Sequence, residues 1–167
     1  MMPLDLLDPF TREFWIPVLA AIVCGGIVGL ERQLRGKPSG MRTCILVCLG
    51  THFFVLLGTA LEGGDPGRVL SQVVSGVGFL GAGVILTRDG LLVGVTSAAV
   101  IWLLAAIGAG IGLGYITAAV AMAIITVAIL VGVEALEKSS LALRQGVHEW
   151  AWNPLARRNG DPPASDE

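Results

Sequence analysis

The stretch GLLVGVTSAAVIWLLAAIGAGIGLGYITAAVAMAIITVAILVGV, residues 90–133, runs for 44 residues without Asp, Glu, Lys or Arg. As a single helix, rising about 1.5 Å per residue, it would be about 66 Å long, roughly twice the hydrocarbon core of a bilayer. It must therefore turn. Glycine stands at every second position from 108 to 114, which gives the backbone the freedom for a tight connection. We expect two helices joined as a Gly-rich hairpin.

Three shorter uncharged runs precede it, at residues 14–30, 43–61 and 69–87. Each approaches the roughly 20 apolar residues that a spanning helix needs. Over the 167 residues, 54% are hydrophobic and only 14% are charged, whereas soluble domains carry about 25% charged residues. The sequence therefore predicts an all-α integral membrane protein with five transmembrane helices. It excludes a soluble enzyme, and its net charge of −2 offers no basic surface for nucleic acid.

The distribution of Lys and Arg predicts the orientation, because cytoplasmic loops carry the excess of these residues. With the N-terminus outside, nine of the eleven lie inside and only Arg12 and Arg68 lie outside. We expect an N-out, C-in topology. We also expect a transmembrane domain at residues 1–136 and a cytoplasmic tail at 137–167. Trp150 and Trp152 favour a tail that first rests on the membrane face, and its last seven residues have a disordered composition.

The loop after the first run, residues 31–43, is the most polar place in the first 130 residues. Its cations are typical of a cytoplasmic loop. Glu31, however, ends the first helix, where a carboxylate is unfavourable unless Arg32, Arg35 or Arg42 compensates it. Two interpretations stay open: an ordinary positive-inside loop, or a structured ionic loop that contacts an anion or a partner.

The dipeptide Asp65-Pro66 precedes the third apolar run. It predicts a helix N-cap followed by proline at the first helical position. The alternative is that Asp65 and Glu62 attract a divalent cation, although two carboxylates without further oxygen ligands make a weak magnesium site.

The third run carries small residues at helical spacing, and we define Ser71, Ser75, Gly78 and Ala82 as the seam. Such a face lets another helix approach closely, so we expect this helix at the centre of the bundle. The GxxxG pair Gly25 and Gly29 is its expected partner. The alternative is a discontinuous helix that exposes backbone carbonyls to an ion.

Cys44, Cys48 and His52 share one face of the second helix. They could bind a soft metal only as adjacent pairs, because the first and last are about 12 Å apart along the axis. Packed side chains are the favoured interpretation, so no metal site and no cofactor are expected. Trp15 is expected to anchor the outer boundary and Trp102 to pack against neighbouring helices. No nucleotide-binding or catalytic motif is present, so no enzyme is predicted.

Three strings together resemble the N-terminal transmembrane domain of the MgtC/SapB family (MgtC/SapB/SrpB/YhiD). They are GGIVGLERQLRGKPSGMRT at 25–43, DPGRVLSQVVSGVGFLGAGVIL at 65–86 and GVTSAAVIWLLAAIGAGIGLGYITA at 94–118. The resemblance covers residues 14–136. Val93 departs from it, since the family often has arginine there. Many members also add an ACT-like soluble domain, and we do not expect regulation through such a domain here.

The resemblance implies a bacterial inner-membrane protein linked to adaptation to low magnesium and to virulence, which acts by modulating other membrane proteins. The expected partners are the lipid bilayer, other membrane proteins and a second copy of the chain. The alternative function is a small transporter or channel for Mg²⁺ or another ion. The family motif falls on Glu31, Arg32, Gln33, Gly36, Lys37, Gly40, Arg42, Thr43, Asp65, Pro66, Arg68, Gln72, Ser75, Gly76, Gly78, Gly81, Gly83, Thr96 and Trp102.

Overall fold

Five helices and one short hairpin form the described structure, a computed structural model that covers residues 6–60, 65–88 and 91–139. In chain order the elements are α1 (Arg12–Leu34), α2 (Met41–Ala60), α3 (Pro66–Gly83), β1 (Leu86–Arg88), β2 (Leu91–Val93), α4 (Val95–Gly112) and α5 (Ile116–Ser139). The chain divides into two units, Met1–Val127 and Ala128–Glu167. The first holds α1 to α4 and the start of α5, and the end of α5 is the described part of the second. The predicted tail contact by Trp150 and Trp152 lies outside the described residues.

Four helices are long and apolar enough to cross a membrane: α1, α2, α4 and α5, the last over Ile116–Leu136. The prediction of an all-helical membrane protein is thus confirmed for four of its five expected spans. The helix α3 does not reach the same hydropathy, because Arg68, Gln72 and two serines lie within its 18 residues.

The third predicted segment was wrong at its end. The helix α3 stops at Gly83, and β1 pairs antiparallel with β2, with Leu86 opposite Val93 and Arg88 opposite Leu91. The uncharged run that begins at residue 90 therefore opens as a strand. Gly94 then precedes α4 as its N-cap with φ +94°, and a side chain there would collide with the carbonyl oxygen of Val84. Only glycine fits this close approach.

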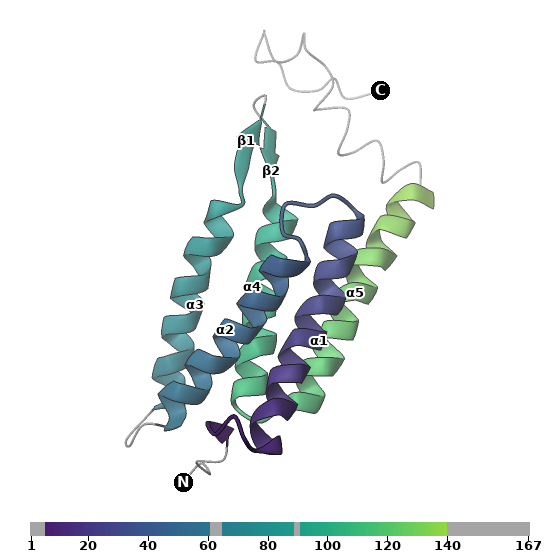
Figure 1. Ribbon diagram of the computed structural model, residues 1–167. Helices are drawn as coiled ribbons and strands as arrows, with labels where there is room; N and C mark the ends of the chain where they lie inside the picture. The colour runs from purple at the N-terminus through teal and green to yellow at the C-terminus, as the bar shows by residue number, and fades with distance from the viewer. Residues whose placement is uncertain (1–5, 61–64, 89–90, 140–167) are drawn as a thin grey trace, which may run out of the picture. The chain divides into compact units, whose positions relative to one another are not determined.

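The core of the first unit is built around α2, which packs against α1 on one side and α4 on the other (Figure 1). A Cβ added at Gly25 would lie 2.7 Å from Ile45 Cα, and one at Gly29 would lie 2.6 Å from Met41 Cα. The expected partner of this GxxxG pair was therefore wrong: it is α2, not the third helix. The two backbones come this close because neither glycine carries a side chain.

Gly108 and Gly112 make the equivalent contact from α4. A Cβ at Gly108 would meet the carbonyl oxygen of Cys48, and one at Gly112 would lie 2.8 Å from the carbonyl oxygen of His52. The connection between α4 and α5 is consequently shorter than the glycine pattern predicted, because the helix continues through Gly112 and only three residues separate the two helices. The four-residue spacing of Gly108 and Gly112 therefore allows α4 to pack closely against α2.

The helix α3 lies at the side of this core and buries only Val77 and Gly81. Val77 packs with Ile101 and Ala105 of α4. The prediction that α3 is the packing centre was therefore wrong, and the seam residues are all exposed. Trp102 was also misplaced: its side chain is 52% exposed, because α4 turns the neighbouring Ile101 and Leu104 toward the core instead. Trp15 is half exposed, and its indole donates to the carbonyl of Pro9 at 2.9 Å.

Candidate functional site

The end of α1 carries a buried cluster of charges. Glu31 is 8% exposed and Arg32 is 2% exposed, and Arg32 Nε lies 2.7 Å from Glu31 Oε2. Arg35, one helical turn further on, places its Nε 2.6 Å from Glu31 Oε1. We call these three residues the ionic cluster. Two guanidinium groups thus neutralise one carboxylate that would be costly to bury alone, and Arg42, the third expected cation, forms no ion pair with it within the described part of the chain.

The turn that follows is closed by backbone hydrogen bonds. Gly36 has φ +62°, and its N–H donates to the carbonyl of Gln33 at 3.1 Å. The N–H of Lys37 donates to the carbonyl of Arg32 at 3.0 Å, which completes a Schellman arrangement. The side-chain oxygen of Gln33 accepts the N–H of Met41 at 3.3 Å and so binds the start of α2. The loop is therefore ordered and carries ion pairs, and its contact with an anion or a partner stays a prediction.

Two polar atoms in this turn are buried without a hydrogen-bond partner: Arg32 Nη1 and Ser39 Oγ. Ser39 was not among the predicted site residues, since a serine in a polar loop gives no signal of burial. Cys44 Sγ lies 4.0 Å from the Ser39 carbonyl oxygen. Lys37, Arg42 and the Thr43 side chain stay exposed around this buried centre.

The face of α2 that carries Cys44, Cys48 and His52 is buried, and His52 is only 1% exposed. Both imidazole nitrogens lack a hydrogen-bond partner. His52 also lines a small cavity of about 230 Å³ together with Glu13 and several apolar side chains. Across the described residues, no three His, Cys, Asp or Glu side chains gather in a way that could hold a metal ion.

The opposite end of α2 meets the start of α3. Asp65 Oδ1 accepts the N–H of Gly67 at 2.9 Å, and Pro66 follows as the first helical residue. The predicted N-cap is therefore confirmed. The charged motif residues thus fall near the two ends of α2, a helix of 20 residues and so about 30 Å long. Glu31, Arg32 and Gln33 lie at one end, and Asp65, Pro66 and Arg68 follow the other.

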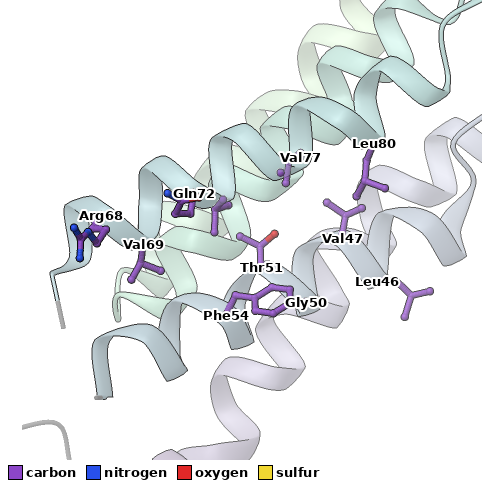
Figure 2. Close-up of a pocket in the computed structure, with 12 residues that line it drawn as sticks. Leu46, Val47, Gly50, Thr51, Phe54, Arg68, Val69, Gln72, Val77 and Leu80 are labelled. Atoms are coloured by element: carbon purple, nitrogen blue, oxygen red, sulfur yellow. The ribbon is translucent and has the colours of Figure 1, made fainter. Parts of the chain in front are cut away.

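A groove runs between α2 and α3, with a volume of about 640 Å³ (Figure 2). Polar groups are few in it: Arg68, Gln72 and Thr51, with Arg68 at one end and Leu80 toward the other. We call this the α2–α3 groove, and its lining consists of Leu46, Val47, Gly50, Thr51, Phe54, Arg68, Val69, Gln72, Val73, Gly76, Val77 and Leu80.

The helix α3 therefore presents two different surfaces. One lines the α2–α3 groove with Gln72 and Gly76, and the other is the seam. A Cβ added at Gly78 on the seam would find no atom within 4 Å. Of the two motif residues on α4, both Thr96 and Trp102 are exposed, whereas the neighbouring Ser97, which the motif did not include, is 2% exposed.

Four apolar helices, a charge cluster neutralised at one helix end and a polar capped turn at the other define a small polytopic α-helical membrane protein. The chain belongs to the MgtC family, whose sequence pattern matches residues 18–139.

Curated relatives support this membership. The chain is 49% identical over 114 residues to "Putative magnesium transporter YhiD" of Escherichia coli K12, which covers 62% of this chain and 53% of that protein. It is 45% identical over 109 residues to "Protein MgtC" of Salmonella typhimurium LT2, which covers 65% of this chain and 47% of that protein. An uncharacterized protein of Haemophilus influenzae is 39% identical over 164 residues, 92% of this chain and 64% of its own length. The chain spans about half the length of the first two relatives. No solved structure matches it.

Proposed function

We propose that this protein sits in the bacterial inner membrane with five spans, its N-terminus outside and its C-terminus in the cytoplasm. The charge split of nine to two supports this orientation. The proposed domain layout is a transmembrane domain at 1–136 and a cytoplasmic tail at 137–167. The proposed five spans include α3, which is less apolar than the other four helices. Its contacts with α2 and α4 mean that part of its surface lies against protein rather than lipid.

The orientation is tested by labelling from outside with an impermeant thiol reagent. Glu62→Cys is expected to react in intact cells and Ser140→Cys only after the membrane is opened. The unsubstituted protein is the control, because its Cys24, Cys44 and Cys48 are all buried. Labelling of position 140 but not 62 in intact cells would reverse the proposed topology.

Within that membrane, we propose that the protein modulates partner membrane proteins by binding them, with no catalysis and no cofactor. The observation that supports this best is the outward-facing seam of α3. Its two serines, glycine and alanine leave a shallow, partly polar helix face. Burial of apolar surface gives little drive between helices in lipid, so close backbone packing and polar contacts carry helix association there. A helix of a partner protein fits these needs.

Ion transport is the second candidate function, because the name of the YhiD relative describes a magnesium transporter. The side chains of this chain give it less support. Mg²⁺ is usually held through carboxylates and sheds its waters reluctantly. The runs at 14–30, 43–61, 69–87 and 90–133 contain no acidic residue, and Gln72 supplies the one side-chain amide oxygen on α3.

The two functions are separated by Gly78→Leu on the seam. Because open space surrounds Gly78, the variant is expected to fold and melt like the parent protein but to lose the support of growth in low magnesium. Ala121→Leu, which enlarges an exposed small residue on α5, is the matched control and is expected to keep that growth. Purified protein in liposomes is expected to give no Mg²⁺ flux above empty vesicles. Saturable flux that disappears in Gln72→Leu would establish transport instead.

A further inference from the structure

The α2–α3 groove has the character of a ligand site rather than of a packing defect. Its volume of about 640 Å³ lies inside the range of about 300–1,000 Å³ that is typical of small-molecule pockets. Its walls are aliphatic side chains, Phe54 and glycines, with a few polar groups that could fix the orientation of a ligand.

The shape of the groove suits an extended chain. From Arg68 to Leu80 the groove follows about 18 Å of α3 at 1.5 Å per residue. Its lining along this length is almost entirely apolar. An extended apolar chain that lies along α3 would therefore bury its surface against both α2 and α3.

The polar groups of the groove are not evenly spread. Arg68 lies in the first turn of α3 and is exposed at one end of the groove, Gln72 lies one turn deeper on the same helix, and Thr51 lines the groove from α2 (Figure 2). Within the described part of the chain, no carboxylate forms an ion pair with Arg68. A guanidinium group binds phosphate oxygens through two parallel hydrogen bonds. The groove therefore offers a cationic end followed by an apolar channel.

This pattern matches the chemistry of one class of molecule, an anionic head joined to an apolar chain. We propose that the α2–α3 groove binds one anionic phospholipid, with an acyl chain along the groove and the phosphate at Arg68. The first turn of α3 lies where the chain enters the apolar region, which is the level of the lipid headgroups. The lipid would also cover the Gln72 side of α3, which is distinct from the seam, so this site is independent of the partner-binding function.

The test measures lipid retained by the purified full chain. The protein is stripped of lipid in a mild detergent, offered phosphatidylglycerol and phosphatidylcholine in equal amounts, and analysed by native mass spectrometry. We expect a preference of about fivefold for phosphatidylglycerol, since one basic side chain near a headgroup contributes about 1 kcal/mol. Arg68→Gln is expected to bring the ratio close to one. Arg12→Gln, which removes another exposed arginine, is the control and should keep the preference.

The acyl chain is tested by a pair of glycines on the same helix. Neither Gly76 nor Gly78 would have a Cβ contact within 4 Å, but only Gly76 lines the groove. Gly76→Leu is expected to lose retained lipid of both kinds, and Gly78→Leu to retain both as the parent protein does. Thermal melting of each variant checks that it is folded. An unchanged preference in Arg68→Gln, or full retention in Gly76→Leu, would overturn the proposal. A third outcome would also overturn it: the parent protein is a dimer, and Gly76→Leu dissociates the dimer without any loss of retained lipid. A second copy of the chain would then occupy the groove.

Discussion

Glycines on α4 and on α3 have opposite surroundings, although both helices are rich in them. Gly108 and Gly112 of α4 lie directly against the backbone of α2, whereas Gly76 and Gly78 of α3 have nothing within reach of a side chain. In the first region glycine allows two helices of one chain to touch. In the second it leaves a surface open. Glycine spacing in a membrane helix thus indicates that a close approach is possible, but not which neighbour makes it.

The largest effect is expected at the polar end of the α1–α2 pair. Glu31→Gln leaves the buried Arg32 without its counter-charge, and removal of one partner from a buried ion pair costs about 3–5 kcal/mol. The free energy of unfolding in detergent, measured by denaturant titration, checks this. Lys37→Gln, which removes an exposed charge from the same turn, is the control. A Glu31→Gln protein as stable as Lys37→Gln would contradict the role given to the ionic cluster.

The next effect is expected where α4 touches α2. Gly108→Ala places a methyl group against the carbonyl oxygen of Cys48, and overpacking of this kind costs about 1–3 kcal/mol. Gly50→Ala on α2 is the matched control, since its Cβ would meet no atom within 4 Å, and it should leave the midpoint of unfolding unchanged or raise it. Equal midpoints of unfolding for Gly108→Ala and Gly50→Ala would contradict the close contact between α4 and α2 at Gly108.

A smaller loss is expected at the start of α3. Asp65→Ala removes the side-chain hydrogen bond to the N–H of Gly67, and loss of an N-cap costs about 1 kcal/mol. Asp65→Asn keeps an oxygen acceptor and is expected to restore most of the stability in the same unfolding titration. If asparagine behaves like alanine, the charge of Asp65 matters rather than its capping.

The smallest effect is expected on the seam itself. Gly78→Leu meets open space and replaces a poor helix former, so its thermal melting point should stay within about 2 °C of that of the parent protein, as for most surface changes. A fall of several degrees would mean that the seam packs inside the folded chain after all.

Local features of this chain were predictable from the sequence and distant contacts were not. The Asp65–Pro66 cap and the compensation of Glu31 by Arg32 and Arg35 involve residues that are close along the chain, so spacing alone places them together. The partner of Gly25 and the outward direction of Gly78 depend on which helices pack side by side, and a small residue looks the same in either setting. The hairpin after α3 was missed because a search for uncharged runs ignores strand pairing, although Asp-Gly at 89–90 is a strong hairpin signal.

The α1–α2 pair has a consequence for how the protein enters the membrane. The contacts of Gly25 and Gly29 with α2, the ionic cluster and the Gln33–Met41 hydrogen bond all lie within residues 25–45. All the residues that make these contacts are therefore present once the ribosome has delivered α2, and both cations that neutralise Glu31 lie within four residues of it along the chain. The second side of α2 is covered only when Gly108 arrives, roughly 2 to 10 seconds later at the usual speed of synthesis. The buried charge cluster is thus neutralised by neighbours on its own helix end, whereas the packing of α2 against α4 depends on residues synthesised much later.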